Sequence, residues 1–376
     1  MKKILNKIIL FISLFIQILT YARYYQGVID GKTFNFKSSF LVEEDTVLDE
    51  GTIISQDLDD VTILVVNGAK LTIEPGRNIS KIVPKHQTFH ETDNYKYGLT
   101  SNIVAIGPNT KVEIKSALIY VNCHFSNAIM ALNGAIIILK NTTIITKSDY
   151  SKGLVVEYNS YADITDNTNI TTEGNSSPCL EVYKNNEGII GSNIFLFSKG
   201  LGSPLINILG EGEVAIYVGN GKAENSQILI NEDINTVYLG NCQFSCNVNT
   251  DDENPNLNSP LNKAGIVLYT KKEKTEKITD LEVQDCILKV ENAKIISCYN
   301  IVADITFEKT TTEFKEIFIQ ADKTKDSDLN TKVTLSLYNT NFKGKIIAHE
   351  DSQISLIVDN NILQNGVETE GKVEFQ

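Results

Sequence analysis

NIVAIGPNTKVEIKSALIYVNCHFSN (residues 102–127) is followed by three segments of similar length and pattern. In register these are AIMALNGAIIILKNTTIITKSDYSK (128–152), GLVVEYNSYADITDNTNITTEGNSS (153–177) and PCLEVYKNNEGIIGSNIFLFSKGLGS (178–203). Each segment holds three short apolar runs separated by turns. A fixed period of about 25 residues is typical of a solenoid, in which stacked coils bury one continuous core.

Three columns of residues recur down this repeat, and we expect all of them to face the interior. The apolar columns are Val104, Met130, Leu154, Leu180 and Ile206, and Ile106, Leu132, Val156, Val182 and Ile208. The polar column is Ser116, Asn141, Asn167 and Asn193, with Asn220 one step further. We expect it to form an internal ladder of bonded amides, because buried amides need partners. Burial of Asn167 is therefore a requirement of this interpretation.

The pattern predicts an all-β fold, a right-handed parallel β-helix with three strands and about 25 residues per coil. Parallel strands need a crossover, which the rest of each coil supplies, and right-handed crossovers are strongly preferred. We expect roughly 10–12 coils. Residues 23–60 are interpreted as an N-terminal cap and residues 61–376 as the β-helix.

The first 22 residues are typical of a secretory signal peptide. Lys2, Lys3 and Lys7 precede the apolar run IILFISLFIQIL, and Thr20-Tyr21-Ala22 provides a cleavage site. We therefore expect a secreted or cell-surface protein, with no membrane insertion after cleavage. The net charge of −13 argues against a nucleic-acid partner.

Several stretches resemble secreted parallel β-helix proteins of the pectate-lyase-like superfamily, and most closely bacterial adhesin-like repeat proteins of unknown role. The matching stretches are TILVVNGAKLTIEPGRNISK (62–81), NYKYGLTSNIVAIGPNTKVEI (94–114), GNSSPCLEVY (174–183) and AGIVLYTKKEKTEKITDLEVQDCILKVENAKIISCYNIVADI (264–305). The resemblance implies the fold. These motifs are degenerate, so they specify the architecture better than the activity.

Enzymes of this superfamily suggest two kinds of site, and the sequence matches neither well. A lyase would need an Arg or Lys base beside carboxylates that hold Ca²⁺, yet Arg77, in a Pro-Gly turn, is the one arginine of the expected core. A glycosidase would need an NTD triplet with GHG and RIK motifs. Here Asn249-Thr250-Asp251-Asp252 lies in a Pro-rich loop, and GHG and RIK are absent. We predict no catalytic residue.

The sequence also supports no metal site. The acidic runs Asp57, Asp59 and Asp60, Glu43 to Asp45, and Asp326 with Asp328 are interpreted as solvated charges, since none has the glycine-placed loop of a calcium motif. His86, His90 and His124 are interpreted as ordinary polar residues. We therefore expect no cofactor, with calcium the only one that the oxygen ligands would suit.

Whether the cysteines form disulfides and whether the sequons are glycosylated depends on export of the chain. An exported chain permits disulfides among the six cysteines. Cys242 and Cys246 are the expected partners, because they are close in the sequence. Cys179 is interpreted as a buried apolar residue. Asn78, Asn169 and Asn175 are candidate glycosylation sites in a host that glycosylates. Asn141 is excluded, since a glycan on an internal ladder would contradict the fold.

Three functions remain open. The first is a non-catalytic, adhesin-like binding module whose outward strands and loops (249–263 and 271–277) contact a glycan, a matrix component or a cell surface. The second is a polysaccharide lyase or hydrolase, and the third is a structural spacer. An acidic protein repels acidic polysaccharides unless Ca²⁺ bridges the two, which disfavours the second.

Overall fold

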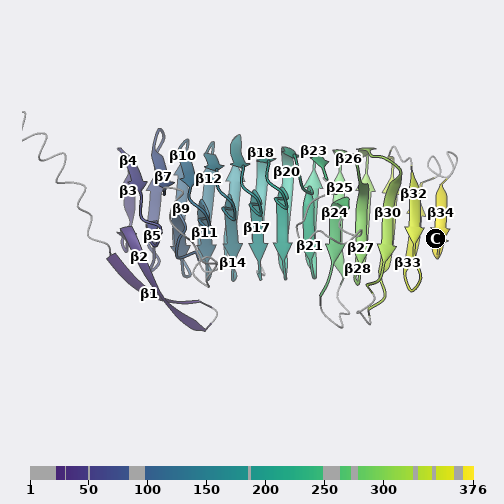
Figure 1. Cartoon of the computed structure of the whole chain (residues 1–376), viewed down its shortest axis with the longest axis horizontal. Coiled ribbons are helices and arrows are strands. Elements are labelled where there is room, and N and C mark those ends of the chain that lie inside the picture. The colour runs from purple at the N-terminus through teal and green to yellow at the C-terminus, as the bar shows by residue number, and fades with distance from the viewer. Residues whose placement is uncertain are drawn as a thin grey trace, which may run out of the picture.

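The computed structural model describes residues 23–29, 31–49, 51–83, 98–184, 188–248, 263–271, 278–324, 329–340, 344–359 and 367–376. These residues form a right-handed parallel β-solenoid of about 11 turns with about 25 residues per turn. Figure 1 shows the turns stacked along one axis, from the purple N-terminal end to the yellow C-terminal end. The predicted fold class, period and number of coils are confirmed, and the described residues contain no helix.

The first strand of each coil belongs to a 14-stranded sheet, called sheet A. Its strands are β1 (Arg23–Ile29), β2 (Lys32–Val42), β5 (Val61–Val65), β8 (Ile103–Ile106), β11 (Ile129–Leu132), β14 (Leu154–Glu157), β17 (Leu180–Tyr183), β19 (Ile206–Leu209), β21 (Leu229–Glu232), β24 (Ala264–Tyr269), β27 (Lys294–Tyr299), β30 (Ile317–Asp322), β32 (Lys345–Ala348) and β34 (Glu368–Gly371). All neighbours pair in parallel except β1 and β2, which form an antiparallel hairpin.

The second and third strands of the coils share a 21-stranded sheet. The second strands are β3 (Thr46–Leu48), β6 (Lys70–Ile73), β9 (Lys111–Lys115), β12 (Ile136–Lys140), β15 (Tyr161–Thr165), the first parts of β18 (Gly188–Ser198) and β20 (Gly212–Ala223), β22 (Asn235–Gly240), β25 (Thr279–Gln284), β28 (Val302–Glu308), β31 (Lys332–Tyr338), β33 (Gln353–Val358) and β35 (Val373–Phe375). The third strands are β4 (Thr52–Ser55), β7 (Asn78–Ile82), β10 (Leu118–Asn122), β13 (Thr143–Thr146), β16 (Thr168–Thr172), the last parts of β18 and β20, β23 (Cys242–Asn247), β26 (Ile287–Glu291) and β29 (Thr311–Glu313).

The solenoid interior is one apolar core, but the predicted apolar columns are only partly inside it. The inward column of sheet A is Ile63, Ile103, Ile129, Leu154, Leu180 and Ile206, in the observed register. Val104, Ile106, Met130 and Leu132 are one residue out of this register and point outward, so their assignment to the inner wall is wrong. Side chains alternate along a strand, so a one-residue slip moves a column to the other face.

A second apolar cluster explains why these outward residues are hydrophobic. Val104 and Met130 pack against Ile29 and Phe36 of the β1–β2 hairpin, which covers the outer face of sheet A in the first coils. Figure 1 shows this hairpin running obliquely from the N-terminal end of the stack. In residues 23–60, β3 and β4 also pair in parallel with β6 and β7, so coil pairing begins before Val61.

Candidate functional site

The predicted polar column lies at the corner between the second and third strands, and it faces outward. Asn141 and Asn167 are exposed, so the expectation of a buried ladder is wrong. Ser116, Asn141, Asn167 and Asn193 have positive φ values of 47°, 48°, 61° and 56°. Asparagine tolerates this left-handed conformation well, and the backbone turn then directs its side chain away from the core. The fold therefore does not require Asn167 to be buried.

Two side-chain pairs remain of the predicted ladder. Asn141 Nδ2 donates to Ser116 Oγ at 2.9 Å, and Asn193 Nδ2 donates to Asn167 Oδ1 at 3.0 Å. Asn220 does not belong to the column: it pairs with Phe195 on β18, beyond a register shift near Ser192. Because Asn141 is exposed, the structural argument against its sequon is also wrong.

The internal polar column lies instead at the corner before sheet A, where sequence reasoning missed it. Asp60, Thr100, Ser126, Ser151, Ser177 and Ser203 occupy equivalent positions of successive coils, and all are buried. Ser151 Oγ accepts the N–H of Ser126 at 3.4 Å and donates to the carbonyl of Cys123 at 2.6 Å. The serine spacing in segments 102–203 was a visible signal for this column.

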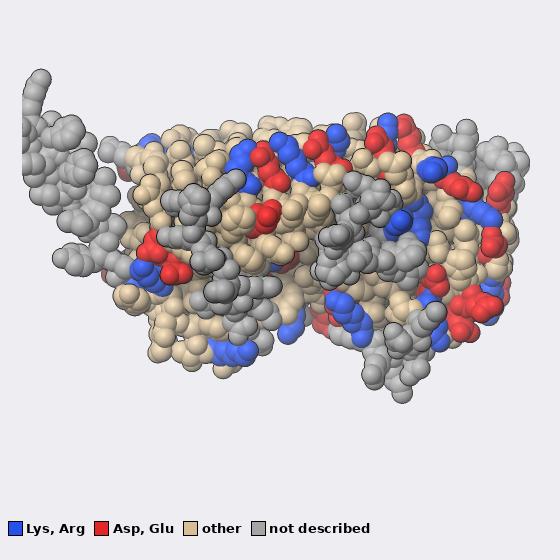
Figure 2. Space-filling view, viewed as in Figure 1, with Lys and Arg blue, Asp and Glu red and all other residues tan. Residues whose placement is uncertain are grey.

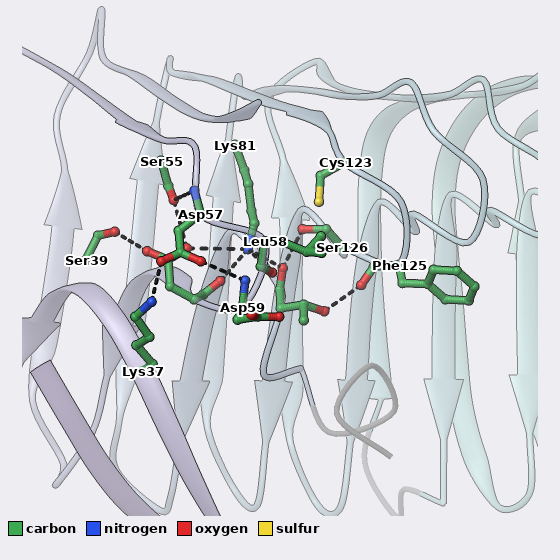
Figure 3. Close-up of polar contacts among 12 residues, drawn as sticks. Lys37, Ser39, Ser55, Asp57, Leu58, Asp59, Lys81, Cys123, Phe125 and Ser126 are labelled. Atoms are coloured by element: carbon green, nitrogen blue, oxygen red, sulfur yellow. Dashed lines mark hydrogen bonds and ion pairs between the residues drawn. The ribbon is translucent and has the colours of Figure 1, made fainter. Parts of the chain in front are cut away.

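The N-terminal end of this column is a buried ion pair, which is the most unusual polar group among the described residues. Lys81 lies at an inward position of β7 and is fully buried, and Asp60 is 2% exposed. The Lys81 Nζ lies 3.5 Å from Asp60 Oδ1 and donates to the carbonyls of Asp60, of Thr100 at 2.8 Å and of Leu58 at 3.3 Å. Figure 3 shows Lys81 directed into this ring of oxygens.

The carboxylate of Asp60 is held from its other side by hydroxyls. Ser55 Oγ donates to Asp60 Oδ1 at 2.8 Å, and Ser39 Oγ donates to Asp60 Oδ2. The interpretation of Asp60 as a solvated charge is therefore wrong. The neighbouring Asp57 is more exposed and pairs with Lys37. Burial raises the pKa of Asp57, but the bond from Lys37, the backbone N–H of Asp59 and the charges of Lys37 and Lys81 together lower it.

These contacts assign a structural role to Lys81. Burial lowers the pKa of the amine, while the nearby Cys123 and Asp60 oppose that shift. Its three N–H groups can all be directed at carbonyl oxygens, so no lone pair is presented to a reactant. The pair closes the first corner of the solenoid and connects β4, β7 and the segment before β8.

A second cluster of titratable groups lies on the outer face of sheet A. Tyr269 and Tyr299 stack with ring centroids 5.0 Å apart, and Tyr269 Oη donates to Glu232 at 2.7 Å. Lys294 donates to Gln320 at 2.6 Å. Burial lowers the pKa of Lys294 to about 8, with the charge of Asp322 acting in the opposite direction. Lys294 begins strand β27 and Tyr299 ends it, so the amine is a separate group on this sheet, and its lowered pKa suits it to proton transfer near neutral pH.

The outward face of the third strands is different in kind, because it is uncharged over half of the stack. We define the third-strand face by the outward positions of β4 to β18: Thr52, Ile54, Asn78, Ser80, Leu118, Tyr120, Thr143, Ile145, Asn169, Thr171, Phe195 and Phe197. Ile54 and Phe195 are 55% and 38% exposed. Along its border Glu173 pairs with Lys147 at 2.5 Å and with Lys199 at 3.1 Å.

The remaining predicted residues do not form a site. Arg77 lies in the turn before β7, and Glu43 to Asp45 are exposed. Asn169 lies on the third-strand face, Asn175 is exposed at a corner, and Asn78 accepts a hydrogen bond from Ser80 of its own sequon at 2.6 Å. His124 lies beyond the end of β10, whereas His86, His90, Asp326, Asp328 and the loops 249–262 and 272–277 lie outside the described residues. Within the described ranges, no group of three His, Cys, Asp or Glu residues could hold a metal ion.

The cysteines are all reduced and buried. The predicted partnership of Cys242 and Cys246 is wrong, because both lie in the extended strand β23. At about 3.3 Å per residue their Cα atoms are about 13 Å apart, well beyond the reach of a disulfide of about 7 Å. Cys179 is fully buried beside Leu180, as expected of an apolar residue.

No family model, no curated protein and no solved structure matches this chain. In the described part of the chain, no helix has the length and apolar character needed to cross a membrane.

Proposed function

We propose that this protein is a secreted or surface-associated, non-catalytic binding module of the adhesin-like kind, and that its third-strand face binds a neutral polysaccharide. The observation that carries the proposal is the lack of charge on that face in a chain with a net charge of −13. Figure 2, which shows one face of the molecule, has acidic and basic side chains intermixed along it. A large uncharged surface is therefore a distinctive feature, and such surfaces commonly mark interaction sites.

The composition of the third-strand face suits sugars better than an apolar protein partner. Tyr120 and Phe195 provide aromatic rings, which can lie against the apolar faces of pyranose rings. The ring of Phe197 lies 5.6 Å from the ammonium of Lys199, at the border of the face. Asn169, Thr143 and Thr171 lie between the aromatic residues and provide donors and acceptors for sugar hydroxyls. Successive strands repeat these groups about every 4.8 Å, which favours an extended polymer over a small ligand.

A binding assay with single-face variants tests this proposal. The full mature chain, made in a host without N-glycosylation so that Asn169 is bare, is incubated with insoluble cellulose or chitin at physiological salt. We expect retention on one of these neutral polymers and at least a tenfold weaker association for the Phe195→Ala, Phe197→Ala double variant. Tyr338→Ala is the matched control, since Tyr338 is 39% exposed and lies on β31 of the second strands.

Two outcomes contradict this proposal. Retention on anionic polygalacturonate with no effect of the Phe195 and Phe197 substitutions contradicts the neutral face as the binding site. Absence of retention on every polymer, with and without Ca²⁺, contradicts a binding function and supports a spacer.

A carbohydrate-active enzyme is the second candidate, and one observation favours it. Lys294, with its lowered pKa, lies on sheet A, where it donates to Gln320 and is close enough to the carboxylate of Asp322 for that charge to act on its pKa. A base and a carboxylate on one outward sheet are what proton abstraction or hydrolysis requires. Release of shortened sugars from a polysaccharide, lost in Lys294→Met but not in Lys289→Met, would establish this activity; Lys289 lies on β26 of the third strands.

A further inference from the structure

Cys242 and Cys286 occupy equivalent positions in two consecutive coils. Each directly precedes a residue of a paired third strand, since Gln243 is in register with Ile287. Both thiols point into the core and are at most 1% exposed. The backbone N–H of Cys242 donates to the Sγ of Cys286 at 3.2 Å. The two thiols are therefore direct neighbours along the solenoid axis.

The other four cysteines have no such neighbour. Cys246 is in register with Val290, and Cys298 is in register with Leu268 and Ala321. Cys179 bonds to Thr172, and Cys123 lies near Lys81 and Ser126. The structure thus brings together one pair of the six cysteines, and the other four are not paired with one another.

The backbone geometry of this pair is compatible with a covalent bond. Residues facing one another on neighbouring parallel strands are about 4.8 Å apart. Disulfides join Cα atoms separated by about 4.4–6.8 Å, so a bridge needs only rotation of the two side chains.

We propose that Cys242 and Cys286 form a disulfide that links the coil of β23 to the coil of β26. The bond forms by exchange with a small disulfide oxidant such as oxidised glutathione. The thiolate of Cys286 attacks one sulfur of the oxidant, breaks its S–S bond and releases one glutathione thiolate. The thiolate of Cys242 then attacks the sulfur of Cys286 in this mixed disulfide and releases the second glutathione. The oxidant gains the two electrons that the two cysteines lose, and the two cysteine protons leave with the released thiols or to solvent.

The burial of both sulfur atoms determines at which stage of folding this exchange takes place. Neither sulfur is accessible in the folded solenoid, so oxidation precedes closure of these two coils. The segment that the bridge would enclose contains residues 249–262 and 272–277, the two long connections on either side of β24. A bridge between Cys242 and Cys286 would hold the two ends of this segment together.

Thiol counting on the unmodified sequence provides the test. The full mature chain is reduced, unfolded and refolded in a glutathione redox buffer, then denatured and alkylated with iodoacetamide without further reduction. We expect four of the six cysteines to be alkylated, and a peptide pair joined through Cys242 and Cys286. Cys286→Ser should leave all five remaining thiols reactive, whereas Cys179→Ser should leave three.

Other results overturn the proposal. These are alkylation of all six cysteines, or a bridge that involves Cys123, Cys179, Cys246 or Cys298. A stability measurement gives an answer that does not depend on variants that fold poorly. The refolded wild type should unfold at a higher guanidinium concentration than the same sample with dithiothreitol. An unchanged midpoint contradicts a cross-link between coils.

Discussion

The Nζ atom of Lys81 lies 2.8 Å from the carbonyl oxygen of Thr100, so a side chain of one coil ends on the backbone of the next. The same amine pairs with Asp60, which precedes Lys81 by 21 residues. Polar groups buried in this way are tolerated only when every charge and donor is satisfied. This requirement leads to the first prediction.

Lys81→Met should strongly destabilise the protein. It leaves the Asp60 carboxylate buried with no countercharge, and loss of one partner of such a pair typically costs about 3–5 kcal/mol. The double variant Asp60→Asn, Lys81→Met should recover part of this loss, because no buried charge remains. Guanidinium denaturation measures both. A single variant within 1 kcal/mol of the wild type would contradict the structural role of the pair.

The buried serine column predicts a smaller and repeated effect. Ser151→Ala removes the acceptor of the Ser126 N–H and the donor to the Cys123 carbonyl. We expect a loss of about 1–3 kcal/mol in the free energy of unfolding, and a similar loss for Ser177→Ala. Ser355→Ala, at an outward position of β33, is the control and should change stability by less than 0.5 kcal/mol. Equal effects at all three serines would refute an internal ladder.

The corner asparagines are predicted to act through the backbone more than through their side chains. Asn167 has a φ of 61°, a conformation that glycine adopts freely and alanine does not. Asn167→Ala should therefore cost about 1 kcal/mol, while Asn167→Gly should be close to neutral. Both substitutions remove the bond from Asn193, so the difference between them isolates the backbone term. If Gly and Ala are equally harmful, the side-chain bond is the dominant contribution.

Lys294 predicts a pH dependence of stability. Burial lowers its pKa from 10.5 to about 8, so the unfolded chain binds more protons than the folded chain between these values. The free energy of unfolding therefore rises between about pH 8 and pH 10.5, and Lys294 accounts for up to about 3 kcal/mol of this rise. Lys294→Met should gain stability relative to the wild type at pH 7 and lose that gain by pH 10.5. Urea denaturation across this range, with Lys289→Met as control, would disprove the assignment if both variants track the wild type.

How far the sequence predicts the candidate site depends on the kind of residue. The third-strand face follows from the alternation of short runs once the coil is known, as Thr143 and Ile145 illustrate beside the buried Ile144. Asp60 could not be identified, because the run Asp57 to Asp60 has the composition of a solvated loop and its partner Lys81 lies in another strand. Only folding brings their charges together.

The sequence by itself determined the period, the three strands per coil and the turns. The spacing of the apolar runs and the Gly, Asn and Asp residues between them specify these features locally. The tertiary structure alone decided which face of sheet A is inside. Ile103 points into the solenoid core, whereas Val104 points outward and packs under the β1–β2 hairpin, so both positions are apolar. A strand buried on both faces has no alternation to read, so only the packed structure sets its register.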